Sequence, residues 1–326
     1  MRNLKSILAA AALAAFACDT AFAQDWPTRP VTMVVPFAAG GPIDTLARVL
    51  QPTLGETLGQ QVIIEHAPGG GGMVGSLRVS QAAADSHTFV LGSIGTHAIS
   101  QSMHKKPSYN AAADFQPVIL VADAPLMLLV RKDLPANNLQ EFIAYANANQ
   151  DKMQHGSGGT GTSSHIGCVL MNQTIGAKII HVPYRGGAPA MQDLIAGRID
   201  YICNYISTAL PVVHSGQAKV LAALAGARAT AFPDVPTAHE QGLKDFDVSA
   251  WNAIFLPKSA TPAMVGKLNA AMSKALDNPV LRKRLDDIGL IAAAPSRRSA
   301  EYLRQYVISE TAKWAEPVKT SGLQVD

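Results

Sequence analysis

Two paired glycines in the segment VVPFAAGGPIDTLARVL, residues 34–50, have the residue types and spacing of an anion-binding turn. A short apolar run at 31–35 precedes them and predicts a strand. Gly40 and Gly41 let the backbone approach a ligand closely, and Pro42 fits the first turn of a helix. The free backbone N–H groups of such a helix start, with the helix dipole, bind a carboxylate or a phosphate without a cationic side chain.

A second turn rich in glycine and hydroxyl groups, HGSGGTGTSSHIGCVLM at residues 155–171, precedes another helical segment. Small hydroxyls and bare amides at a helix start are groups that hold a carboxylate, although an ordinary N-cap gives the same pattern. The serines do not indicate a nucleophile, because the sequence has no G-x-S-x-G elbow and no assignable acid–histidine pair. Two such turns predict a ligand clamped between two lobes.

Two further loops carry residues with possible chemistry. The segment HVPYRGGAPAMQDLIAGRIDY at 181–201 has Tyr184 and Arg185 in a loop between a strand and a helix. An arginine there either faces a carboxylate with two hydrogen bonds or is solvated. The glycines at 70–75 satisfy G-x-G-x-x-G, but a glycine run does so by chance, and we favour a flexible loop entering a helix over a nucleotide site.

Histidine and cysteine placement gives no sign of a metal or a cofactor. The 9 histidines form no H-E-x-x-H motif, and no Cys-x-x-Cys occurs, so we expect each histidine to be exposed or satisfied locally. His165, inside the second turn, is the one to test as a ligand contact. For Cys168 and Cys203 we expect two buried thiols rather than a disulfide, although an oxidising compartment permits a bridge.

Strands rich in Val and Ile alternate with helical segments, which indicates an α/β fold with mostly parallel sheets covered by helices. The expected strands lie near 31–36, 61–65, 88–92, 153–156, 178–182, 199–203 and 219–224. The expected C-terminal helices, which should pack on the first domain, span 262–277, 279–288 and 299–319.

Two apolar segments are candidates for strands that cross between domains, namely 115–131 and 248–257. If both cross, the fold is two-lobed and these strands form a hinge. The first lobe is then discontinuous, comprising 24–122 and 250–326, and the second lobe is 123–249.

The N-terminus has the pattern of a secretory signal peptide over residues 1–23, with a basic start, an apolar run and the small-residue sequence Ala21-Phe22-Ala23. We expect cleavage before Gln24 and a periplasmic protein; lipid attachment at Cys18 is the alternative, but the usual leucine ahead of the cysteine is missing.

The formal net charge of +3 gives no indication of a nucleic-acid or membrane-surface partner. The 326 residues, 48% of them hydrophobic, suffice for two cores.

An ordered series of segments resembles the substrate-binding proteins of tripartite tricarboxylate transporters, the Bug family of periplasmic receptors. The resemblance covers the chain from about Trp26 to the C-terminus and rests on WPTRPVTMVVPFAAGGPID, APGGGGMVGS, DFQPVILV, GSGGTGTSSH, HVPYRGGAPAMQDLIAGRIDY, FPDVPTAHEQG and ISETAKWAEPVK. It implies a monomeric two-lobed receptor that closes around a small carboxylate and delivers it to membrane permease subunits.

By position, the resemblance implies ligand-binding residues in both lobes. Those of the first lobe are Phe37, Ala38, Gly40, Gly41, Asp44, Ser93 and Thr96. Those of the second lobe are Ser157, Gly158, Thr160, Gly161, Thr162, Ser163, His165, Tyr184 and Arg185. The chain departs from the family pattern at Asp85-Ser86-His87-Thr88 and at Pro42-Ile43, so its ligand can differ from that of familiar members.

The sequence therefore predicts a periplasmic solute receptor for a di- or tricarboxylate, aliphatic or aromatic, with no catalysis and no cofactor. A receptor that serves a signalling ectodomain has the same sequence features. An exported α/β hydrolase or transferase is the rival from another class, but it needs a nucleophile and a base in one cleft, and neither is assignable.

Overall fold

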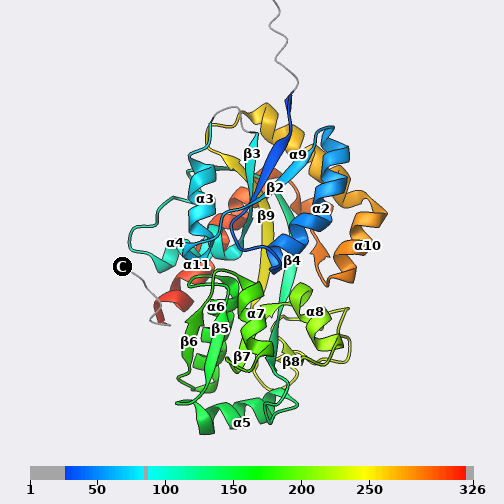
Figure 1. Cartoon of the computed structure of the whole chain (residues 1–326). Coiled ribbons are helices and arrows are strands. Elements are labelled where there is room, and N and C mark those ends of the chain that lie inside the picture. The colour runs from blue at the N-terminus through cyan, green and yellow to red at the C-terminus, as the bar shows by residue number, and fades with distance from the viewer. Residues whose placement is uncertain (1–25, 84–86, 321–326) are drawn as a thin grey trace, which may run out of the picture.

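The first lobe is built on a mixed sheet with strand order β2-β1-β3-β9-β4 (Figure 1). The computed structural model describes residues 26–83 and 87–320, so the expected leader at 1–23 lies outside the described residues. β1 pairs in parallel with β2 and β3, and β9 pairs antiparallel with β3 and β4. The strands are β1 (Val31–Val35), β2 (Val62–His66), β3 (Thr88–Ser93), β4 (Phe115–Arg131) and β9 (Ser249–Pro257), and the short β10 (Ile291–Ala292) also pairs with β4.

The second lobe continues from the far half of β4. There β4 pairs antiparallel with β7 and β8, and β7 continues in parallel to β5 and β6. Its strands are β5 (Gln154–Ser157), β6 (Ile180–Pro183), β7 (Tyr201–Tyr205) and β8 (Ala218–Ala223). The seven strands expected between 31 and 224 are therefore present, each within about two residues of its expected bounds.

The two crossings differ in kind. β4 is one continuous strand that pairs with β9 as far as Pro125 and with β7 from Leu126 onward. The chain returns to the first lobe between two consecutive residues. The Val248 N–H donates to the Leu224 carbonyl at 2.6 Å in the second lobe, and Ser249 already pairs with Pro125. The segment 248–257 thus crosses at its first residue and then runs within the first lobe. The residue bounds of the two lobes remain a prediction.

Helices cover both sheets. Around the first lobe lie α2 (Pro42–Leu58), α3 (Met73–Ser80), α4 (Ser100–Met103), α9 (Pro262–Asp277), α10 (Pro279–Asp287) and α11 (Ala300–Thr320). Around the second lie α5 (Leu139–Asn149), α6 (Ser163–Ile175), α7 (Gly187–Ile195) and α8 (Ile206–His214). The described residues also form short helical turns, namely η1 (Gly70–Gly72), η2 (Gly95–Ile99) and η3 (Pro295–Arg297). In the described ranges, none of the helices combines the length and apolar character needed to cross a membrane.

Side chains of β4 alternate between two hydrophobic cores, as the two-residue period of a strand requires. Leu128 and Val130 belong to the larger core, whereas Met127 and Leu129 belong to a smaller one formed with α7 and α8. This smaller core fixes α7 and α8 on one face of the second sheet, with their first residues at its carboxyl edge (Figure 1).

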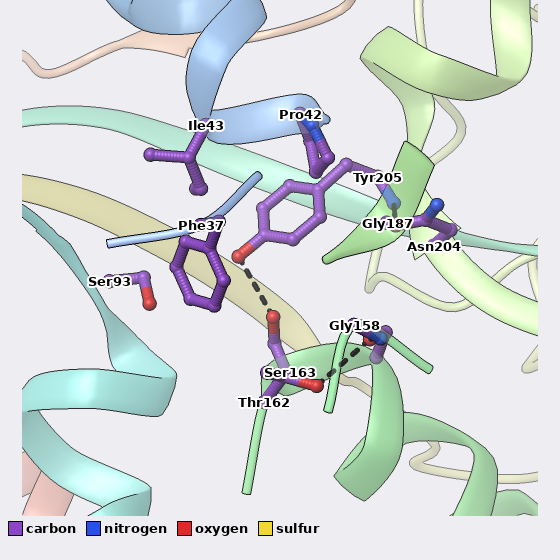
Figure 2. Close-up of a pocket in the computed structure, with 11 residues that line it drawn as sticks. Phe37, Pro42, Ile43, Ser93, Gly158, Thr162, Ser163, Gly187, Asn204 and Tyr205 are labelled. Atoms are coloured by element: carbon purple, nitrogen blue, oxygen red, sulfur yellow. Dashed lines mark hydrogen bonds between the residues drawn. The ribbon is translucent and has the colours of Figure 1, made fainter. Parts of the chain in front are cut away.

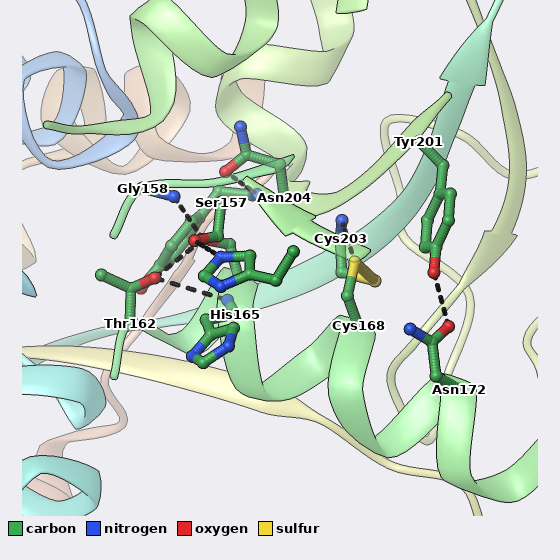
Figure 3. Close-up of a disulfide and its surroundings, with 12 residues drawn as sticks. Ser157, Gly158, Thr162, His165, Cys168, Asn172, Tyr201, Cys203 and Asn204 are labelled. Carbon is green, nitrogen blue, oxygen red and sulfur yellow. Dashed lines mark hydrogen bonds between the residues drawn. A yellow bond between two sulfur atoms is a disulfide. The ribbon is translucent and has the colours of Figure 1, made fainter. Parts of the chain in front are cut away.

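Cys168 and Cys203 form a disulfide between α6 and β7, so the expectation of two free thiols is wrong (Figure 3). The physical reason is the neighbouring Gly167, where a Cβ would lie only 3.3 Å from the Cys203 Cβ. Because this glycine lets the helix approach the strand, the two cysteine Cα atoms are 5.3 Å apart, within the usual range for a disulfide. Both cysteines are fully buried.

Candidate functional site

A pocket lies where the two lobes meet, and both lobes line it (Figure 2). Its volume is about 20 Å³, room for roughly one water molecule, so the lobes are closed against each other. A larger solute has to enter while they are apart. The first lobe contributes Phe37, Pro42, Ile43 and Ser93, and the second contributes Gly158, Thr162, Ser163, Ser164, Gly187, Asn204 and Tyr205.

The first expected turn connects β1 to α2. Gly40 has a φ of +78°, a conformation that favours glycine, and its N–H donates to Asp44 Oδ2 at 2.7 Å. Asp44 also accepts from Arg48 Nε at 3.0 Å and lies 2.7 Å from His66 Nε2. Burial acts to raise the pKa of Asp44, but these hydrogen bonds outweigh it and the pKa lies below its usual value. Asp44 therefore holds the turn in shape and lies outside the pocket lining.

The second expected turn connects β5 to α6 and is braced by its own hydroxyl groups. Thr162 is the N-cap of α6, where its Oγ1 accepts from the His165 N–H and donates to the Gly159 carbonyl at 2.7 Å. Ser164 Oγ accepts from the Gly158 N–H at 3.0 Å. These bonds use much of the hydrogen-bonding capacity of the turn, so it presents a fixed rather than adaptable wall to the pocket.

Four helices begin at the pocket: α2, α6, α7 and α8. Only α6 has a side-chain cap; the N-caps of α2, α7 and α8, which are Gly41, Gly186 and Tyr205, make no side-chain cap hydrogen bond. The starts of α2 and α7 come from opposite lobes and lie close, since a Cβ on Gly41 would be 3.6 Å from the Gly187 N. Converging helix N-termini with free N–H groups favour a negative charge between them. None of the described lining residues carries a charge.

Backbone contacts close the lobes beside the pocket. The Ala38 N–H donates to the Arg185 carbonyl at 3.3 Å, and a Cβ on Gly186 would be 3.2 Å from the Ala38 N. The glycine-rich loop before α3 also takes part, because a Cβ on Gly71 would be 2.1 Å from the Thr160 carbonyl oxygen. Gly71 thus allows close contact between the lobes, a role that the sequence pattern of this loop did not predict.

Five of the expected ligand-binding residues line the pocket: Phe37, Ser93, Gly158, Thr162 and Ser163. Of the others, Gly40, Gly41, Ala38, Thr160 and Gly161 belong to the turns and their contacts between the lobes. Ser157 and Thr96 support the turns from behind, with Ser157 Oγ 2.6 Å from His181 Nε2 and Thr96 Oγ1 accepting from the Ser93 N–H at 2.9 Å. Tyr184 donates to Asp193 at 2.6 Å, and the Arg185 side chain is exposed.

Six lining residues were not among the ligand-binding residues expected from the resemblance: Pro42, Ile43, Ser164, Gly187, Asn204 and Tyr205. Asn204 and Tyr205 directly follow the strand expected at 199–203, and the carboxyl ends of strands in an α/β sheet are where ligands bind. Their position at the carboxyl end of an expected strand was therefore the one indication of Asn204 and Tyr205 that the sequence offered.

Three histidines stack behind the second turn. His165 lies on His181 with ring centroids 3.8 Å apart, and His181 lies 4.9 Å from His155. Burial, and then proximity to neighbouring imidazoles, lowers the pKa of His155 and of His165 to about 3, and burial lowers the pKa of His181 to about 4. All three are neutral near pH 7.

Among the described residues, no group of three or more His, Cys, Asp or Glu side chains is arranged to hold a metal ion.

Comparison with protein families matches residues 46–323 to the tripartite tricarboxylate transporter family receptor. The chain belongs to this family. It is thus a solute receptor of a transport system, in a family of binding proteins rather than enzymes.

Solved structures of related receptors share its fold. MatC from Rhodopseudomonas palustris, solved with bound malate, is 40% identical with a TM-score of 0.87, over 90% of this chain and 100% of that one. The periplasmic binding protein BugD is 33% identical with a TM-score of 0.88, over 92% and 99% of the two chains. A second R. palustris protein, Rpa4515 with adipate, is 31% identical with a TM-score of 0.87, over 91% and 99%. The α/β periplasmic binding protein fold expected from the sequence is confirmed.

Proposed function

We propose that this receptor captures a small di- or tricarboxylate between its lobes in the periplasm and delivers it to the permease subunits of a tripartite tricarboxylate transporter. The observation that carries the proposal is the meeting of the N-termini of α2 and α7, from opposite lobes and without side-chain caps, at an uncharged pocket. Related receptors bind malate and adipate, which supports a carboxylate as the ligand class.

A carboxylate between the two helix starts stabilises the closed arrangement, because only there do both helix ends act on one charge. Lobe 1 at 24–122 and 250–326 and lobe 2 at 123–249 are the rigid bodies of this motion. The hinge consists of β4 near Pro125 and the single-step return at Val248, the two places where the chain passes between the sheets. The permease would then recognise the closed, loaded form.

Thermal unfolding with a panel of carboxylates tests the ligand class. We expect malate, succinate, adipate or citrate at 100 times its dissociation constant to add about 2.7 kcal/mol to the free energy of unfolding. Succinamide, which keeps the carbon chain of succinate but has no charge, is the matched control and should not stabilise. If the uncharged amide stabilises as well as succinate does, the helix N-termini are not the recognition element.

X-ray scattering tests the closure, since the radius of gyration should be smaller with the stabilising carboxylate than without it.

The compartment is tested by N-terminal sequencing of protein from a periplasmic fraction, which should begin at Gln24. A chain that retains a lipid-modified Cys18 would contradict the expected processing.

A further inference from the structure

Arg185 lies at the edge of the pocket, where the two lobes touch. Its backbone carbonyl accepts from the Ala38 N–H of the first lobe at 3.3 Å. The pocket begins beside this contact in both lobes, because Phe37 precedes Ala38, Gly187 follows shortly after Arg185, and both line the pocket (Figure 2). The Arg185 side chain is exposed and does not belong to the lining. Its guanidinium is therefore a charge at the edge of the pocket, outside the volume that the closed lobes enclose.

The positive charge of Arg185 has no counter-ion within the part of the chain that the structure describes, since no hydrogen bond or ion pair involves its side chain. The charged groups of the adjoining segments are paired. Asp193 of α7 pairs with Arg198, and Asp44 in the first turn of α2 pairs with Arg48. Two opposite charges side by side largely cancel at a distance, whereas a single charge keeps its field. An anion that approaches this edge therefore meets the unbalanced charge of Arg185.

The groups that line the pocket act only at short range. The N-termini of α2 and α7 have partial charges whose effect falls off within the first turn. The Tyr205 hydroxyl accepts from Ser163 Oγ at 2.8 Å, which leaves its own O–H free to donate, but a hydrogen bond needs direct contact (Figure 2). None of the described lining residues has a full charge. The lining can hold an anion that has arrived, but it does not attract one from the surrounding solvent.

A full charge reaches further into the solvent than these groups do. Its field extends over about 10 Å at an ionic strength of 0.1 M and about 30 Å at 0.01 M. When the lobes are apart, the hydrogen bond between Ala38 and Arg185 cannot form, and Arg185 lies at the edge of the open cleft. Charges beside a cleft raise the rate at which ligands of opposite charge arrive.

We propose that Arg185 is an entrance residue, whose guanidinium draws an anionic ligand toward the open cleft and stays in the solvent when the lobes close. It speeds the capture of the ligand without holding the bound ligand, and retention is left to the helix N-termini and the hydroxyl groups of the lining. The inference rests on the proposed function and adds to it the residue that sets the rate of capture.

Separate measurement of the association and dissociation rate constants distinguishes attraction from contact. Calorimetry gives the dissociation constant, exchange spectroscopy with a ¹³C-labelled ligand gives the dissociation rate constant, and the two together give the association rate constant. The probes are malate, succinate, adipate and citrate. By Coulomb's law, one positive charge about 10 Å from a dianion in water changes a rate constant about threefold at low ionic strength.

Arg185→Gln should therefore lower the association rate constant for a dicarboxylate about threefold at an ionic strength of about 10 mM, with little change in the dissociation rate constant. Arg185→Glu reverses the charge and should lower the association rate constant about tenfold. Arg185→Lys keeps the charge and should associate as fast as the wild type. At about 1 M, where the Debye length is about 3 Å, all four proteins should associate equally fast.

Lys178→Gln is the matched control. Lys178 is an exposed cation that precedes β6, whereas Arg185 follows the same strand at its other end, beside the pocket. Loss of the Lys178 charge should leave both rate constants nearly unchanged at every ionic strength.

Two results would overturn the role of Arg185 and leave the proposed function standing. One is an unchanged association rate constant in folded Arg185→Gln at low ionic strength. The other is a faster dissociation of Arg185→Gln that persists at about 1 M, which would mean that Arg185 contacts the bound ligand. If the wild-type receptor binds none of the four carboxylates, the proposed function and this inference both fail.

Discussion

Ser163 Oγ and Tyr205 Oη lie 2.8 Å apart, and their hydrogen bond joins the first residue of α6 to the residue that precedes α8. Both residues line the pocket, so the second lobe presents two helix starts as one connected surface. The disulfide between Cys168 and Cys203 ties the same helix to the same strand further from the pocket (Figure 3). The hydrogen bond at the pocket and the disulfide further from it therefore both hold α6 against β7, where the second lobe lines the pocket.

Removal of the Tyr205 hydroxyl should reduce ligand affinity with little effect on the fold. Tyr205→Phe keeps the ring but loses the free O–H donor, and a hydrogen bond to a charged ligand is worth about 1.5–3 kcal/mol. We expect calorimetry to show at least a tenfold weaker dicarboxylate. Tyr201→Phe is the control. Tyr201 lies in the same strand as Tyr205, β7, but outside the pocket lining, and its hydroxyl donates to Asn172 Oδ1. It should lower stability by about 1 kcal/mol and leave affinity unchanged; a similar affinity loss in both variants would contradict the assignment.

A methyl group on Gly187 should hold the lobes apart. An added Cβ would lie 2.9 Å from Pro42 Cδ across the pocket and 3.3 Å from Asn204 Nδ2. Gly187→Ala should weaken the ligand at least tenfold, and scattering should show less compaction at saturating ligand. Gly266→Ala is the matched control, because nothing lies within 4 Å of its Cβ in the interior of α9. That variant should gain about 0.5–1 kcal/mol of stability and bind normally. Full compaction of Gly187→Ala would show that the two helix starts do not need to meet.

The stacked histidines should make the protein less stable in mild acid. An unfolded histidine has a pKa near 6.5, whereas the folded pKa is about 3 for His155 and for His165 and about 4 for His181. Between these values the unfolded chain binds more protons than the folded one, so stability falls as pH drops from about 6.5 toward 4.

Urea unfolding at several pH values measures this slope. His155→Phe keeps a ring in the stack but removes one titrating group, and should reduce the slope by up to about 1.4 kcal/mol per pH unit. Tyr201→Phe, whose ring lies 5.5 Å from that of His155, leaves every imidazole in place and should keep the wild-type slope. An unchanged slope in His155→Phe would mean that His155 is protonated equally in both states.

Loss of the disulfide should be costly. It closes a loop with a sequence separation of 35, for which chain-entropy arguments give about 3–4 kcal/mol. We expect the double variant Cys168→Ala with Cys203→Ala, and wild-type protein unfolded under reductant, to lose similar amounts in urea titrations. Reductant should have no effect on the double variant. If it has none on the wild type either, the two cysteines are not paired.

The sequence predicted the fold well because the apolar pattern of the strands is local information. The run at 115–131 has no charged residue between Phe115 and Asp123, and it became the one strand shared by both sheets. The disulfide was beyond this reasoning, because the spacing of Cys168 and Cys203 along the chain says nothing about how closely α6 approaches β7. That distance depends on Gly167, which as a residue within a helix gives no separate signal.

For the site, glycine-rich turns were found because their composition is distinctive. Asn204 and Tyr205 were missed because YICNYISTAL contains no glycine and no charge, and it has the composition of an ordinary buried strand. Their position at the pocket comes from the order of strands in the second sheet, which places the end of β7 between β4 and β5. The spacing of residues along the sequence does not reveal the order of the strands in the sheet.

The position of β9 in the sheet also orders the folding of the chain. β9 lies between β3 and β4, yet it is synthesised only after the whole of the second lobe. Until residues 249–257 are available, β3 and β4 have unpaired edges, and closing the gap joins segments more than 100 residues apart. The second lobe, including its half of β4, is continuous in sequence and can form first. The first lobe is thus begun by the N-terminus and completed last, and a chain that ends before 249 lacks the strand that closes its sheet.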